Sequence, residues 1–195
     1  MNHGLAILYA TSEGQTQKIA DHIAERFRED GYEVDIFMAK QLPRDFDLLA
    51  HQGVIIGAPV HMGEYPGHIK QLVRRHRSDL QGMPSAFFSV SLTEAEEDEM
   101  QRQEIQQLIN RFLGDVQWQP TVIASFAGAV PFSRYGFIKK LIMRSIIRRR
   151  MGEVDTSKDY EYTDWVSVDE FVDQFDSHLA VARAASGSNR PSAPR

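Results

Sequence analysis

The first thirty residues place a strand pattern, a short polar turn and a helix pattern directly after one another. Leu5–Ala10 is a continuous apolar run, as expected of a central parallel strand covered on both faces. The polar turn Thr11–Thr16 follows at once, and a helix pattern with Ile19, Ile23 and Phe27 begins near Gln15. This order places free backbone N–H groups at a helix N-terminus, where they can bind a phosphate.

The chemistry of the turn narrows the choice of phosphate ligand. Thr11, Ser12 and Thr16 supply hydroxyl donors, and Gly14 lets the backbone approach a ligand closely. The turn contains no Lys or Arg, so it lacks the Gly-Lys-Ser/Thr ending of a nucleoside triphosphate loop, and the G-x-G-x-x-G fingerprint of dinucleotide sites is also missing. We therefore expect one terminal phosphate held by N–H and O–H groups without a cation, which fits FMN.

The rest of the chain continues to alternate strand and helix patterns. Strands are predicted at Val34–Met38, Gln52–Pro59, Ser85–Leu92 and Thr121–Val130, and helices at Gly67–Arg77, Glu94–Leu113 and from about Thr163, with Thr163 or Asp164 as the cap. This alternation predicts an α/β fold, a flavodoxin-like five-stranded parallel sheet with helices on both faces and a ligand at the carboxyl ends of the strands. We expect a single domain over residues 1–183, with an insertion at about 130–160, and a disordered tail over 184–195.

One segment breaks this regular pattern. From Val116 through Gly152 there is no Asp or Glu, and Arg134–Arg150 combines Lys and Arg with many apolar residues. It is predicted to be an inserted basic amphipathic helix that contacts an anionic membrane, the propionates of a porphyrin or an acidic partner; the alternative is a solvated helix packed on the sheet edge. Nucleic-acid binding is disfavoured, because the formal net charge is −5 and no recognised motif surrounds the basic strip.

Several kinds of site are excluded by residue content. The chain has no Cys, which rules out disulfides, thiolate metal sites and Cys nucleophiles. Its seven His residues lack a metal-binding spacing, and no G-x-S-x-G motif surrounds Ser89 or Ser91, which are expected to be loop donors. Neither a signal peptide nor a transmembrane stretch is recognisable, so we expect a cytoplasmic protein with at most peripheral contact to the inner (plasma) membrane.

The chain resembles the flavodoxin-type protoporphyrinogen oxidase family in several segments that occur in the same order. They are Thr11–Thr16, Val54–Ala58, Met83–Val90, Ala127–Ala129, Lys140–Met143, Gly152–Thr156 and Tyr162–Trp165. One departure is His61-Met62-Gly63, where the family usually carries Arg-Tyr-Gly, and a second is the strongly acidic segment after the fourth strand.

The resemblance implies that two further loops, Pro59–Gly63 and Ser89–Leu92, surround the flavin ring. The residues expected to bind the cofactor are then Thr11, Ser12, Glu13, Gly14, Gln15, Thr16, Pro59, Val60, His61, Met62, Gly63, Ser89, Val90, Ser91 and Leu92. Val60, Met62 and Tyr65 are candidates to cover the ring, the alternative being ordinary surface residues. No side-chain nucleophile is needed, because the flavin carries the redox chemistry; His61 is the side chain that could touch cofactor or substrate, or simply be a solvated loop residue.

The activity implied by the resemblance is the oxidation of protoporphyrinogen IX to protoporphyrin IX in haem biosynthesis. Electrons would pass through FMN to a membrane quinone, menaquinone or ubiquinone. Two alternatives remain open: a flavodoxin-type electron carrier without catalysis of its own, and an NAD(P)H:quinone reductase on the same fold. The basic segment argues against a carrier that docks on basic partners, and activity with NAD(P)H would identify the reductase.

Overall fold

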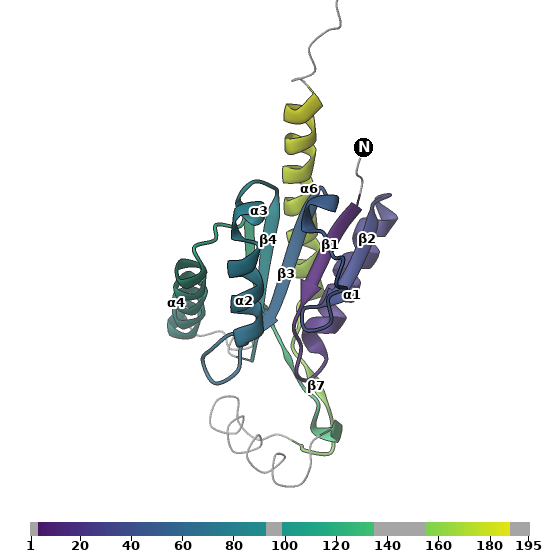
Figure 1. Ribbon diagram of the computed structural model, residues 1–195. Coiled ribbons are helices and arrows are strands. Elements are labelled where there is room, and N and C mark those ends of the chain that lie inside the picture. Colours follow the sequence, from purple (N-terminus) through teal and green to yellow (C-terminus); the bar gives the residue numbers. More distant parts are fainter. Residues whose placement is uncertain (1–3, 93–98, 135–154, 188–195) are drawn as a thin grey trace, which may run out of the picture.

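The computed structural model describes residues 4–92, 99–134 and 155–187. Its centre is a five-stranded parallel sheet with the order β2-β1-β3-β4-β5 (Figure 1). The strands are β1 (Gly4–Tyr9), β2 (Glu33–Met38), β3 (Gly53–Pro59), β4 (Ser85–Ser91) and β5 (Val122–Ala127). Both the parallel sheet and the flavodoxin-like order agree with the prediction from sequence, and the strand order reverses beside β1, where ligands of such sheets bind.

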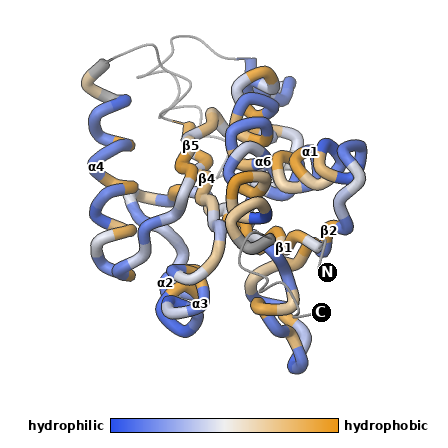
Figure 2. Tube along the Cα trace, turned by 90° about the horizontal axis from the view of Figure 1, so that it is seen from above, coloured by the Kyte–Doolittle hydropathy of each residue, from blue (hydrophilic) through white to orange (hydrophobic). Residues whose placement is uncertain are grey.

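Helices cover both faces of the sheet, as Figure 2 shows from above. They are α1 (Gln15–Glu29), α2 (Gly67–Arg75), α3 (Arg77–Gln81), α4 (Glu99–Val116) and α6 (Trp165–Gly187). The side chains of α1 and α6 form one core with alternate residues of the strands, whereas α2, α3 and α4 form the other core on the opposite face. The strands carry continuous apolar runs because a parallel strand covered on both faces buries the side chain at every position.

The last helix illustrates how spacing determines packing. Val168, Phe171, Val172 and Phe175, predicted to point inward, are all buried, and Leu179 continues the same stripe. Burying each such side chain stabilises the fold by about 1.5–3 kcal/mol. Asp164 caps the helix, since its carboxylate accepts hydrogen bonds from the Val166 N–H at 3.0 Å and the Ser167 hydroxyl at 2.7 Å.

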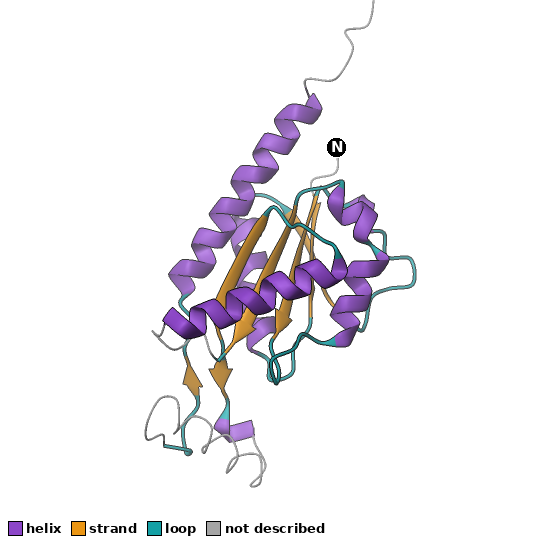
Figure 3. Ribbon diagram, turned by 90° about the vertical axis from the view of Figure 1, so that its left-hand side faces the viewer, coloured by secondary structure: helices purple, strands orange, loops and turns teal. Residues whose placement is uncertain are grey.

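The predicted fifth strand, Thr121–Val130, does not remain in one sheet. β5 ends at Ala127, and Ala129–Val130 forms β6, which pairs antiparallel with β7 (Tyr160–Glu161) below the carboxyl edge of the main sheet (Figure 3). The Gly128 N–H still donates to the Ser91 carbonyl at 2.9 Å, so the chain leaves the sheet immediately after that bond. β6 and β7 thus form a two-stranded stem at the base of the expected insertion.

Other boundaries also shift. The helix predicted over Gly67–Arg77 ends at Arg75, and α3 follows as a separate short helix. The described part of α4 begins at Glu99, so the acidic residues 94–98 lie outside the described residues. α6 extends to Gly187, so residues 184–187 of the expected tail are helical, whereas 188–195 lie outside the described part.

Candidate functional site

The turn between β1 and α1 has the geometry of an anion site. Gly14 adopts the left-handed conformation, with φ 99° and ψ −15°, and its N–H donates to the Thr11 Oγ1 at 2.9 Å. The Gly14 carbonyl accepts the Lys18 N–H at 3.0 Å, which starts the helical bonding. Because the Thr11 oxygen is the acceptor of this bond, the Thr11 hydroxyl hydrogen can still donate to a ligand.

The turn also presents donors that α1 cannot satisfy itself. The first N–H groups of any α-helix, here those from Gln15 onward, have no intrahelical acceptor. Thr16, the second residue of α1, is only 2% exposed. A terminal phosphate can be bound by such unpaired amides together with the hydroxyls of Thr11 and Thr16. Gly14 lets the backbone come close to it.

The loop after β3 is a tight hairpin. His61 and Glu64 exchange two backbone hydrogen bonds of 3.0 Å each. Met62 and Gly63 between them have positive φ angles of 51° and 76°, as in a type I′ turn. Met62 is a non-glycine residue in a conformation that side chains disfavour, and its side chain is 103% exposed at the tip. The apolar tip can therefore cover a neighbouring ligand.

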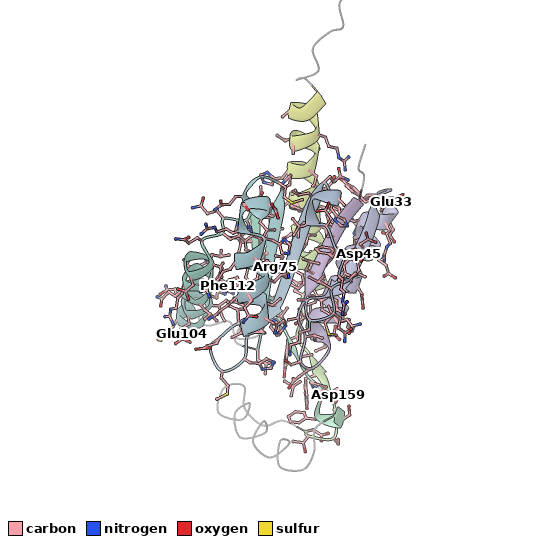
Figure 4. The ribbon with its side chains drawn as sticks, in the orientation of Figure 1. Glu33, Asp45, Arg75, Glu104, Phe112 and Asp159 are labelled. Atoms are coloured by element: carbon pink, nitrogen blue, oxygen red, sulfur yellow. The ribbon has the colours of Figure 1, made fainter. Side chains whose placement is uncertain are left out.

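Tyr65 does not cover a ligand, contrary to one interpretation of the sequence. It is 3% exposed, and its ring packs 4.6 Å from that of Phe112 on α4, which is labelled in Figure 4. Its hydroxyl donates to the Ser89 Oγ at 2.8 Å, in a fully buried contact. Tyr65 is thus a core residue that joins the hairpin to β4.

The segment Ser89–Leu92 is also not the loop that the sequence suggested. Ser89, Val90 and Ser91 are the last residues of β4 and all are buried; only Leu92 lies beyond the strand. Ser89 and Ser91 are therefore strand residues and not loop residues, and the Ser89 Oγ accepts a hydrogen bond from the Tyr65 hydroxyl. At the sheet edge the backbone of this segment holds the loop after β3, since the Val90 carbonyl accepts the Val60 N–H at 2.8 Å.

The parallel arrangement brings these three segments to one edge of the sheet. β1, β3 and β4 are neighbours, so the turn Thr11–Thr16, the hairpin His61–Glu64 and the end of β4 meet at their carboxyl ends, the lower end in Figure 1. A further bond, from the Ala10 N–H to the Gly57 carbonyl at 2.9 Å, ties the start of the turn to β3. The predicted cofactor-binding segments are therefore adjacent in the fold.

A fourth segment, for which the sequence predicted only a helix cap at Thr163 or Asp164, reaches the same edge. The Gln15 side chain donates to the Thr163 Oγ1 at 2.8 Å, and the Thr163 hydroxyl donates to the Ala127 carbonyl at 2.7 Å. The Lys18 Nζ lies 2.5 Å from a Glu161 carboxylate oxygen, and this bond lowers the pKa of Glu161 below its usual value. The stem β6–β7 and the start of α6 are thus attached to the helix that begins at the turn.

Two hollows flank the turn. One, with a cavity volume of about 570 Å³, lies between the start of α1 and the stem, where Asp159 is labelled in Figure 4. The Asp159 carboxylate accepts hydrogen bonds from the Ser133 N–H at 2.7 Å and the Ser133 hydroxyl at 2.6 Å, which holds the outer end of the stem. The other hollow, of about 500 Å³, lies between the turn and the start of α2 and includes His61 and Lys40.

Some sequence predictions lie outside the described residues. The basic helix expected over Arg134–Arg150 falls there except for the backbone of Arg134, which ends a 3-10 turn (Phe132–Arg134). Within residues 4–92, 99–134 and 155–187, no helix is long and apolar enough to cross a bilayer. In the same ranges, no three His, Asp or Glu side chains are grouped so as to hold a metal ion.

Comparison with known proteins adds to this geometry. The flavodoxin domain model matches residues 6–157. The chain is 32% identical over 173 residues to protoporphyrinogen IX dehydrogenase (quinone) of Escherichia coli K12, which covers 89% of this chain and 94% of that protein. It is 32% identical over 170 residues to the protein of the same name from Leishmania major, covering 87% and 73% respectively. Flavodoxin 1 of Bacillus cereus has a TM-score of 0.55 at 17% identity, covering 90% and 98%, a likeness of fold alone.

Proposed function

Because this chain belongs to the flavodoxin domain family and, within it, to the quinone-dependent protoporphyrinogen IX dehydrogenases, we propose that it oxidises protoporphyrinogen IX to protoporphyrin IX with a quinone as electron acceptor. The observation that carries the proposal is the 32% identity to the Escherichia coli enzyme, which extends over 94% of that protein. A match of this extent includes the stem and the start of α6, and not only the phosphate turn that other flavodoxin-like proteins share.

The cofactor that we assign is FMN. The turn Thr11–Thr16 would hold its single phosphate through main-chain N–H groups and the hydroxyls of Thr11 and Thr16, and Gly14 would leave room for the backbone to approach. Backbone groups of Pro59–Gly63 and of Ser89–Leu92 would border the ring at the edge of the sheet. When bound, the flavin supplies a group that can take up and pass on two electrons at a time.

The reaction balances as three equivalent steps. Each step removes two electrons and two protons from the tetrapyrrole and reduces one quinone to a quinol, so three quinones are consumed for each protoporphyrin formed. The chain contributes a rigid frame to this chemistry. Tyr65 and Ser89 fix the hairpin relative to β4, and the bond from Ala10 to Gly57 fixes the turn relative to β3.

A quinone dissolved in lipid requires the protein to reach a membrane. We assign this contact to the basic segment Arg134–Arg150, where each Lys or Arg near an anionic surface contributes about 1 kcal/mol of binding free energy. Replacing Lys139, Lys140, Arg144 and Arg148 together with Gln should abolish sedimentation with anionic vesicles, with neutral phosphatidylcholine vesicles as the control. Undiminished sedimentation would contradict the membrane role and would favour a cytoplasmic protein without peripheral attachment.

The enzymatic assay compares three activities of one FMN-loaded preparation. Protoporphyrin fluorescence should rise with protoporphyrinogen IX and menaquinone well above the rate of autoxidation without protein. A yellow protein with no rate above autoxidation would refute the enzyme and leave the electron carrier. Oxidation of NAD(P)H by quinone in the absence of porphyrinogen would identify the reductase instead.

A further inference from the structure

The hollow between the phosphate turn and the start of α2 has a composition that the cofactor does not explain. It is a cavity of about 500 Å³, and its lining includes Thr11 and Ser12 of the turn, Lys40 after β2, and Glu64 and His68. We call it the Lys40 pocket. It shares Thr11 and Ser12 with the turn, but Gly14, Gln15 and Thr16, whose amides begin α1, do not line it. The pocket thus adjoins the expected phosphate position and shares only Thr11 and Ser12 with it.

The sheet positions Lys40 in the lining of this pocket. The N–H of its neighbour Ala39 donates to the Tyr9 carbonyl at 2.7 Å, which continues the pairing of β1 and β2 past the end of β2. Lys40 is exposed and makes no ion pair with any residue of the described ranges. Glu64 is the one carboxylate among the described residues that line the pocket, and it does not pair with Lys40. The Lys40 ammonium group is therefore available to a ligand.

His68 adds a donor to the lining of the pocket. It is half-buried in the second residue of α2, and burial followed by the positive charge of Lys40 lowers the pKa of its imidazole. The imidazole is therefore neutral near pH 7, with one ring N–H to donate, and it feels the Lys40 charge across the pocket. Together with the Ser12 hydroxyl, these groups form a set of donors around one cation, which suits a carboxylate.

We propose that Lys40 and His68 bind a propionate carboxylate of the tetrapyrrole and thereby orient the substrate at the flavin edge. This inference rests on the proposed function, which supplies a substrate with two such carboxylates. The hairpin residue His61 borders both the pocket and the expected ring position, so a macrocycle over the ring would reach the pocket with a short arm. A cavity of about 500 Å³ has room for a carboxylate arm and its waters.

The Lys40 ammonium group could instead bind the FMN phosphate, so the experiment must distinguish a propionate carboxylate from that phosphate. Protoporphyrin IX and its dimethyl ester, which has no free carboxylate, are titrated into FMN-loaded protein, and the quenching of tryptophan fluorescence is measured. We expect the wild-type chain to bind the free acid roughly tenfold more tightly than the ester, the value of one charge-assisted hydrogen bond. In Lys40→Met this preference should fall to about twofold or less, and Lys40→Arg should restore it.

Lys70→Met is the matched control, because it removes one positive charge from α2, two residues after His68, at a position that does not line the pocket. It should keep the wild-type preference for the acid. FMN affinity, measured by quenching of flavin fluorescence, should be unchanged in Lys40→Met. A loss of FMN affinity with the acid preference intact would overturn the inference and assign Lys40 to the phosphate.

Two further outcomes distinguish this inference from the proposed function. If the wild-type chain binds both porphyrins and Lys40→Met retains the preference for the acid, the inference is wrong and the function stands. If the wild-type chain binds neither porphyrin, both are wrong.

Discussion

Gly57 lies in the central strand β3. Replacing it with Ala tests whether the ring of Phe88 fills the space above its Cα, and the free energy of unfolding reports the result. Gly57 of β3 pairs with Phe88 of β4, and a Cβ atom added to Gly57 would lie 2.1 Å from Cζ of the Phe88 ring. Ordinary contact begins near 3.4 Å, so the ring would have to retreat by about 1.3 Å. The Phe88 side chain is 0% exposed, and the rings of Phe126 and Phe171 lie against it at centroid distances of 5.9 and 6.2 Å.

The cost of Gly57→Ala follows from this confinement. Adding a methyl group to a filled core costs about 1–3 kcal/mol, and we expect the upper end, about 3 kcal/mol, because the ring has no open space to enter. For a chain of this length the melting temperature should fall by roughly 6–12 °C. FMN affinity should fall as well, since the Gly57 carbonyl holds the Ala10 N–H directly before the turn.

The free energy of unfolding is measured by urea denaturation with the intrinsic fluorescence of Trp118 and Trp165. Gly114→Ala is the control: it lies in α4 with nothing within 4 Å of the added Cβ, and should be neutral or stabilising by up to about 1 kcal/mol. In the background Phe88→Leu, which shortens the opposing side chain, Gly57→Ala should cost at least about 1 kcal/mol less. An equal cost in both backgrounds, or no cost at all, would refute the packing argument.

Three further predictions concern the site and its supports. Gly14→Ala forces a side chain into the left-handed conformation at a strain of roughly 1–2 kcal/mol, so flavin fluorescence titration should show about tenfold weaker FMN binding; unchanged binding would remove the turn from the site. Tyr65→Phe leaves the buried Ser89 Oγ without its donor and should cost about 1–3 kcal/mol in urea unfolding, most of which should vanish in a Ser89→Ala background. The hydrogen bond from Lys18 lowers the pKa of Glu161 below its ordinary value of 4.5. The pair is partly exposed, so its contribution to the free energy of unfolding is under about 1 kcal/mol. That contribution is present above pH 4.5 and is lost as the pH falls through the lower folded-state pKa. Lys18→Met should therefore destabilise the chain most at pH 7 and progressively less as the pH falls below 4.5, and a pH-independent difference would contradict the coupling.

Much of the fold could be predicted because its signals are local. The apolar run before Thr11, the stripe Ile19, Ile23 and Phe27, and the Gly14 that starts α1 each depend on residues within one element, and the structure agrees with all three. Periodicity and turn chemistry are properties of neighbouring residues, so a single sequence carries them. The family resemblance, which depends on segments spread along the chain, was confirmed by the comparisons.

The errors occurred where the environment of a residue depends on a distant segment. Ser89 looks like a polar loop residue, but the Tyr65 hydroxyl, 24 positions away, makes its burial in β4 favourable. The predicted fifth strand continues in sequence through Val130, but Tyr160–Glu161 offers a second pairing partner, and the chain leaves the main sheet at Gly128. Neither partner can be read from the local pattern, because hydrogen bonding and burial are settled only when the two segments meet.

The sequence alone determined that this chain forms a parallel sheet with a polar, glycine-containing turn between its first strand and first helix, because strand, turn and helix signals act over a few neighbouring residues. Only the tertiary structure decided which charges surround that turn. Lys40 lies beyond the second strand, and parallel pairing of β2 with β1 carries it to the edge where Thr11 and Ser12 lie. A cation from the segment after β2 therefore lies in the pocket beside the turn after β1, since a sheet brings together side chains that the chain keeps apart.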